Sequence, residues 1–188
     1  MRPTLTEELM AAGRGVFGLL IGERKAPGYF DFSSRGLAGS FIAFVLVTAL
    51  NAGLPIMLGM VVPPGTFSRS LFTVGILFAL QVGFSLIVLR QLKRLDGFVP
   101  YLVADNWATF FLTLISGAFA AAGVAGDVLI VMLGIVIIVL EINIARLVIT
   151  LSPLQIAMFI IARMVGASLG ILIARFAGLI PELQGMPS

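Results

Sequence analysis

The chain has 188 residues, of which 60% are hydrophobic and only 11% are charged, and its formal net charge is +3. This balance leaves too little polar surface for a water-soluble domain, so it predicts a membrane protein. The chain has no cysteine and no histidine, which excludes disulfides, thiolate metal sites and the commonest general base. We attribute the positive charge to the membrane flanks and do not expect nucleic-acid binding.

Residues 1–35 are expected to form a cytoplasmic or interfacial segment that contains an amphipathic helix, Thr4–Ile21. Its apolar residues recur at three- and four-residue spacing; they are Leu5, Leu9, Ala12, Val16 and Leu20. Two arrangements fit this pattern. The helix lies in the headgroup plane, with basic side chains toward anionic phosphates at the cytoplasmic face, or it packs as a cap over the membrane helices.

Aromatic residues mark the expected membrane interface. Tyr29, Phe30 and Phe32 follow a Pro-Gly turn directly before the first apolar stretch, and Trp107 begins the third. Because aromatic rings favour the headgroup level, we interpret all four as interface anchors.

Five apolar stretches follow, at residues 36–62, 70–89, 107–125, 128–151 and 153–180. Each is near the ~20 residues that cross ~30 Å of hydrocarbon. Backbone groups in a bilayer must bond within their own segment, so each stretch should be an α-helix. The sequence thus predicts an all-α, polytopic bundle over residues 36–181, followed by a short external tail at 182–188.

The basic residues predict the orientation. Arg90, Lys93 and Arg94 lie between the second and third stretches, while the connection at 63–69 carries one arginine and the link at 126–127 carries none. The positive-inside rule therefore places the N-terminus inside and the C-terminus outside. Residues 90–106 are expected to form a cytoplasmic surface loop, with Asp105 or Asn106 capping the third helix.

The last two stretches contain a candidate ion pair. Glu141 and Arg163 are each 11 residues from a predicted turn at Ser152, which puts both ~16 Å along their helices, near the membrane midplane. We predict that they pair, because an unpaired charge at that depth costs at least ~2.5 kcal/mol. With Asn143 and Gln155 nearby, the pair either lines an ion route or clasps the two helices together. The clasp is favoured, since only one deep carboxylate is expected.

Small residues recur at every fourth position of the last stretch, which predicts close helix packing; they are Ala162, Gly166, Gly170, Ala174 and Gly178. Such a stripe serves either the monomer or a homo-oligomer. In the first stretch, Pro55 should kink the helix near Asn51, and Gln81 of the second stretch is the expected hydrogen-bond partner of that region.

Five spans, an Asn106-Trp107 pair at the start of the third span, and the pre-span sequence from Asp31 to Gly36 resemble the broad Yip1-type family of small membrane proteins. The resemblance implies a non-enzymatic role in membrane organisation, trafficking or partner recruitment. We therefore expect an assembly or interaction protein whose partner is another membrane protein or a second copy. The alternative is a small transporter or channel subunit with a midplane site at Glu141 and Arg163.

An enzyme is not expected, because no Ser, Asp or Glu stands beside a suitable base. We expect no catalytic residues, cofactor or metal. Arginine outnumbers lysine ten to two and the connections are short. This composition and these loop lengths favour a bacterial inner membrane.

Overall fold

The computed structural model describes residues 5–124 and 126–180, and every regular element in this part of the chain is helical. A first helix, α1, precedes five helices that are long and apolar enough to cross a membrane. The prediction of an all-α, five-span membrane protein is therefore confirmed. The elements are α1 (Leu5–Leu20), η1 (Ala26–Tyr29), α2 (Ser34–Met57), α3 (Thr66–Gln91), η2 (Leu95–Gly97), α4 (Phe98–Ala121), α5 (Asp127–Asn143), the π-helical turn η3 (Ile144–Val148) and α6 (Pro153–Phe176).

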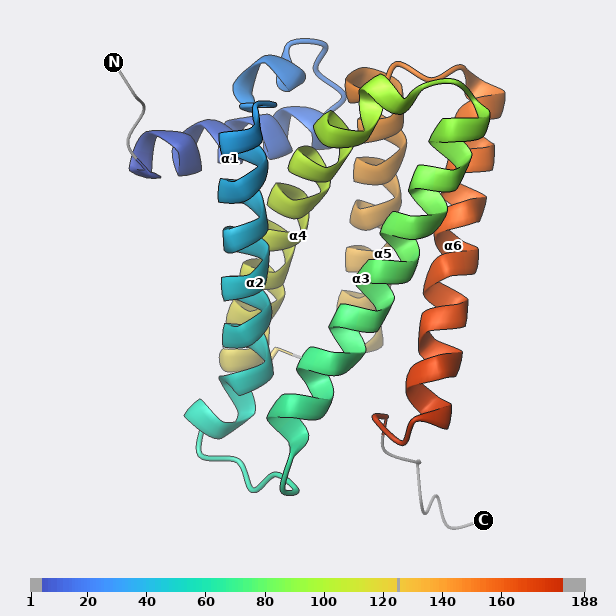
Figure 1. Ribbon diagram of the computed structural model, residues 1–188. Coiled ribbons are helices and arrows are strands. Elements are labelled where there is room, and N and C mark those ends of the chain that lie inside the picture. The colour runs from blue at the N-terminus through green and yellow to red at the C-terminus, as the bar shows by residue number, and fades with distance from the viewer. Residues whose placement is uncertain (1–4, 125, 181–188) are drawn as a thin grey trace.

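The long helices stand side by side, and α1 lies across one end of them (Figure 1). This α1 end also carries the turns that join α3 to α4 and α5 to α6. The opposite end carries the other two connections and the last turn of α6. The predicted external tail, 182–188, lies outside the described residues, as does Thr4.

Burial in this bundle differs from that in a soluble protein, because many large apolar side chains are exposed while some polar ones are buried. The polar side chains of Ser40, Ser85 and Asn106 are at most 1% exposed, whereas large apolar residues such as Ile130 and Met164 are more than 60% exposed. Hydrocarbon solvates apolar side chains but not polar ones, so this distribution fits a bilayer.

Helix α4 begins at Phe98, well before the predicted start at residue 107, so the expected surface loop is largely wrong. Pro100 does not prevent this, because it lies in the first turn of the helix, where backbone N–H groups have no intrahelical acceptor. Asp105 and Asn106 consequently lie within the helix and are buried, instead of capping it.

The start of α2 explains the sequence from Asp31 to Gly36 in physical terms. Ser33 caps the helix by accepting a hydrogen bond from the Gly36 N–H, and its own N–H donates to the Asp31 carboxylate at 2.9 Å. This bond lowers the pKa of Asp31 below its ordinary value. A Cβ at Gly36 would lie 1.8 Å from the Asp31 carbonyl oxygen, so only glycine fits this approach.

Helices α2 and α6 end earlier than predicted, at Met57 and Phe176. Both end on a glycine with positive φ, Gly59 at 71° and Gly178 at 66°, and the next N–H bonds back into the last turn. This is the usual glycine termination of a helix. Gly178 therefore ends α6 and does not belong to the packing stripe.

Helix α1 packs against the bundle on its small-residue face. Ala12 and Leu19 are at most 2% exposed, and Gly15 leaves room for the ring of Phe30, which would be 2.6 Å from a Cβ there. The Asn143 amide donates to the Leu19 carbonyl at 2.7 Å and so fastens α1 to the end of α5. Helix α1 thus packs against the end of the bundle, while its other face keeps Phe17 exposed.

Arg94 joins the two turns at the α1 end. Its guanidinium donates to the backbone carbonyls of Ile149 and Thr150 and to the Thr150 hydroxyl. These carbonyls follow η3, where the chain turns and Thr150 adopts a φ of 59°. One side chain from the α3–α4 turn therefore donates hydrogen bonds to carbonyl groups that lie beyond the end of the helix and lack intrahelical partners.

Helices α3 and α6 approach closely along the predicted stripe. A Cβ at Gly166 would lie 3.0 Å from the Leu80 carbonyl oxygen, and one at Gly170 would lie 3.1 Å from the Leu77 Cα. Ala162 and Ala174 are also buried on α6. Small residues here bring two backbones together, as they commonly do in membranes.

Gly166→Ala should therefore destabilise the protein by about 1–3 kcal/mol, because the added methyl group meets backbone of α3. Gly75→Ala is the matched control, since no atom lies within 4 Å of that Cβ. The free energy of unfolding in mixed detergent micelles measures both. Equal stability of the two variants would contradict close packing at Gly166.

Candidate functional site

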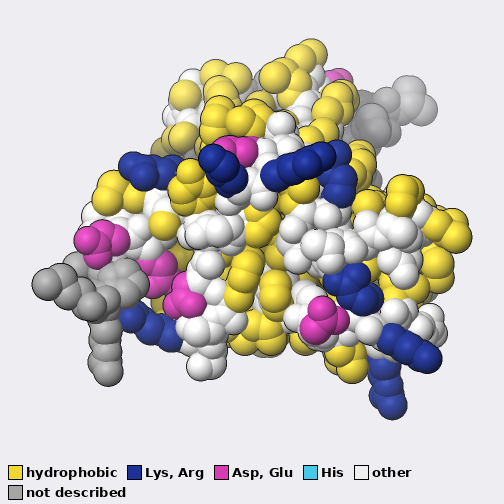
Figure 2. All heavy atoms as spheres, turned by 90° about the horizontal axis from the view of Figure 1, so that it is seen from above, with side chains coloured by type: hydrophobic (Ala, Val, Ile, Leu, Met, Phe, Trp, Pro, Cys, Tyr) yellow, Lys and Arg dark blue, Asp and Glu magenta, His cyan; other side chains and the backbone are white. Residues whose placement is uncertain are grey.

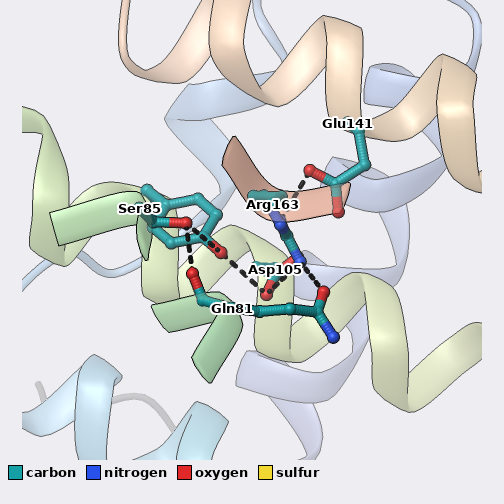
Figure 3. Close-up of polar contacts among 6 residues, drawn as sticks. Gln81, Ser85, Asp105, Glu141 and Arg163 are labelled. Atoms are coloured by element: carbon teal, nitrogen blue, oxygen red, sulfur yellow. Dashed lines mark hydrogen bonds and ion pairs between the residues drawn. The ribbon is translucent and has the colours of Figure 1, made fainter. Parts of the chain in front are cut away.

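Arg163 of α6 is the centre of a group of polar side chains in the bundle interior (Figure 3). Its Nη1 atom lies 2.9 Å from Asp105 Oδ1 and 2.6 Å from Glu141 Oε2. We call Asp105, Glu141 and Arg163 the ionic cluster. All three side chains are largely buried, with 9%, 16% and 12% of their surface exposed.

Polar and aromatic neighbours complete the surroundings of the cluster. Arg163 Nη2 donates to the Gln81 side-chain oxygen at 3.1 Å, and the Tyr101 hydroxyl donates to Asp105 Oδ2 at 3.4 Å. The guanidinium carbon lies 5.1 Å from the centre of the Tyr101 ring, which is within cation–π distance. Ser85 lies next to the Tyr101 hydroxyl at 3.3 Å. Arg163 thus contacts groups from α3, α4 and α5.

The predicted Glu141–Arg163 pair is present in the structure. The expectation that Glu141 is the only deep carboxylate is wrong, because Asp105 bonds the same guanidinium. This residue was missed because α4 begins a full two turns earlier than the hydropathy pattern indicates. A buried arginine has five N–H donors to satisfy, so a single carboxylate was an incomplete set of partners.

Three of the supporting polar residues have hydrogen-bond partners that the sequence does not predict. Gln81 accepts from Arg163 and not from the region of Asn51, which is exposed. Asn143 binds the Leu19 carbonyl. Gln155 accepts a hydrogen bond from the Ser152 backbone at 3.0 Å, which makes it part of the helix cap of α6.

The aromatic anchors are also corrected in part. Tyr29 is 38% exposed and Phe32 is half-buried. Phe30 and Trp107 are buried, at 8% and 6% exposure. Phe30 fills the space over α1, and the Trp107 ring stacks on Phe111 within the bundle. The two rings are thus core residues.

Asn106 holds α4 against α2. Its amide donates to the Ser40 hydroxyl at 3.2 Å, and Ser40 in turn donates to the Leu37 carbonyl at 2.9 Å. Interhelical hydrogen bonds of this kind satisfy polar groups in the bilayer interior, where water is absent. Asn106 therefore links α4 to α2.

The ionic cluster borders a cavity of about 250 Å³. Thr109, Thr113 and Ser116 of α4 line it together with the charged residues and apolar residues of α5. The cluster has two carboxylates and one guanidinium, so its formal charge is negative when all three ionise. Within the described part of the chain, no group of three or more potential metal ligands is found.

Comparison with protein-family models, with curated proteins and with solved structures finds no match to this chain.

The geometry predicts different losses of stability on removing the charge of Arg163 and that of Glu141. Arg163→Met should destabilise the protein by about 3–5 kcal/mol, because two buried carboxylates lose their partner. Glu141→Gln should cost about 1–3 kcal/mol, because Asp105 still pairs with Arg163. Adding Arg163→Met to Glu141→Gln should not restore stability.

Unfolding by a denaturing detergent in mixed micelles measures these differences, with Glu23→Gln as a control on an exposed carboxylate. Restoration of stability in the Glu141→Gln, Arg163→Met double variant would mean that Asp105 does not share the arginine.

Proposed function

We propose that this protein is a non-enzymatic integral membrane protein that acts in membrane organisation or as an assembly partner of other membrane proteins. One observation carries the proposal: the Arg163 guanidinium binds side chains of three other spans. Contacts of this kind hold four spans in one arrangement. The outer surfaces of the bundle then keep a fixed shape that a partner can bind. The resemblance to the Yip1-type family supports the same class of role.

Charge supports an orientation with the α1 end in the cytoplasm. Lys and Arg gather at this end, seen from above in Figure 2, whereas the opposite end has Arg69 and Arg175. The positive-inside rule then places the N-terminus inside. We further propose a bacterial inner membrane, on the basis of the arginine-rich composition and the short connections.

Single cysteines test the orientation, since the natural chain has none. Gly28→Cys lies at the α1 end and Ser68→Cys at the opposite end, and both positions are exposed. A membrane-impermeant maleimide should label Ser68→Cys in intact cells, and Gly28→Cys only after lysis. The reverse pattern would invert the orientation.

Affinity purification from native membranes in mild detergent tests the assembly role. We expect one membrane-protein partner, or a second copy of the chain, at a fixed ratio in both the wild type and a folded Glu141→Gln variant. Quantitative mass spectrometry gives the ratio, and an unrelated five-span protein at equal expression is the control. A chain that purifies alone, folded and monomeric, would contradict the assembly role.

A second candidate function is a small transporter or channel subunit. Asp105 favours it, because a second deep carboxylate borders the same cavity as Glu141, and intramembrane carboxylates often mark ion paths. Reconstituted vesicles with an internal pH dye distinguish the two functions. A proton flux that Glu141→Gln abolishes, without unfolding the protein, would support transport, whereas absence of flux from the wild type would remove it.

A further inference from the structure

The ionic cluster carries an unbalanced charge. Arg163 is always protonated in proteins, whereas Asp105 and Glu141 are both anions when they ionise, so the fully ionised cluster has one negative charge in excess. Figure 3 shows both carboxyl groups beside the guanidinium, and each of the three side chains exposes at most 16% of its surface. An unbalanced charge is costly at this depth of a bilayer, because no water surrounds it. One further positive charge is therefore expected at the cluster.

The helices around Glu141 offer no second cation among the residues that the structure describes. The charged groups that face it are Arg163 of α6 and Asp105 of α4. Helix α3 contributes Gln81, which is neutral, and Tyr101 of α4 adds a phenol whose ring faces the guanidinium. These neighbours leave the excess negative charge in place.

Helix α1 and the turn η3 also pack against α5, but their charged side chains do not balance the cluster. Arg14 of α1 and Arg146 of η3 are exposed. The other charged residues of α1 are acidic: Glu7 is exposed, and Glu8 lies against Gly39 of α2. The balancing cation therefore comes from solution. In the described part of the chain no three potential metal ligands lie together, so a proton suits the cluster better than a metal ion.

The hydrogen bonds identify the carboxyl group that holds this proton. Asp105 accepts from Nη1 and Nη2 of Arg163, at 2.9 and 3.4 Å, and from the Tyr101 hydroxyl at 3.4 Å. Glu141 accepts a single bond from Arg163, through Oε2. Because hydrogen bonds to a carboxylate favour its charged form, Asp105 is the anion of the pair and Glu141 is the acid.

The contact between the two carboxyl groups also requires a proton. The Glu141 side chain lies within hydrogen-bonding range of Asp105. Two ionised carboxylates have only acceptor atoms and repel each other at this range, whereas a protonated carboxyl group donates to a carboxylate. Both residues border the cavity of about 250 Å³ that Thr109, Thr113 and Ser116 also line. A polar cavity of this size holds water, which delivers the proton to Glu141.

We propose that Glu141 binds one proton at neutral pH and donates it in a hydrogen bond to the Asp105 carboxylate, so that the ionic cluster is electrically neutral. The proton is taken up from water and stays covalently bound to a Glu141 carboxyl oxygen. It belongs to the resting protein and rests on neither proposed function. A chain that carries no proton flux still holds it, so a failed flux assay and a failed test of this site are distinguishable.

Infrared spectroscopy of the full chain at neutral pH, in a detergent without ester groups, tests the proposal. We expect the C=O stretching band of one buried carboxylic acid, because exposed Asp and Glu side chains are ionised at this pH. Labelling all glutamate carboxyl groups with a heavy carbon isotope should shift the band, and labelling all aspartate carboxyl groups should not. Absence of the band from the folded wild type would overturn the proposal. A shift with the aspartate label would overturn the assignment to Glu141.

Two variants test the charge balance by the same measurement. Glu141→Gln and Asp105→Asn should each abolish the band, because the one carboxylate that remains then balances Arg163. Glu23→Gln alters an exposed carboxylate and is the matched control; its band should equal that of the wild type. Thermal unfolding confirms that each variant is folded, and the isotope labels keep the test decisive if one is not. A band that persists in folded Asp105→Asn would overturn the charge-balance argument.

Discussion

The position of one arginine in the hydrocarbon interior determines much of this structure. Arg163 lies ten residues after the start of α6, or about 15 Å along the helix axis. A guanidinium at that depth is costly unless anions and acceptors surround it. Asp105, Glu141 and Gln81 supply them from α4, α5 and α3, so the relative heights of these helices are fixed by a polar interaction as well as by packing.

The approach of α3 to α6 makes that interaction geometrically feasible. Gly166 is three residues from Arg163, and its Cα faces the backbone of Leu80 and Gln81. Because the two helices touch there without intervening side chains, Gln81 can reach the guanidinium. Close packing and the polar contact therefore depend on each other, and losing either one should weaken the other.

The sequence predicted the spans and the Glu141–Arg163 pair, because both follow from local rules. Apolar length gives the spans, and two residues equidistant from the turn at Ser152 reach the same depth on adjacent helices. Asp105 is expected to cap the third helix, since it lies just before Trp107 and the third apolar stretch. Only the three-dimensional position of Arg163 makes a buried Asp105 favourable, and no local pattern contains that information. The same holds for Asn143, whose partner Leu19 is far away in the sequence.

We infer that the three side chains of the ionic cluster stabilise the bundle as a paired set and not as individual charges. The most direct measurement is the free energy of unfolding of the triple variant Asp105→Asn, Glu141→Gln, Arg163→Met, compared with each single variant in the same micelles. We predict that the triple variant is more stable than Arg163→Met alone, because no unpaired charge remains buried. A triple variant whose loss equals the sum of the three single losses would contradict the claim.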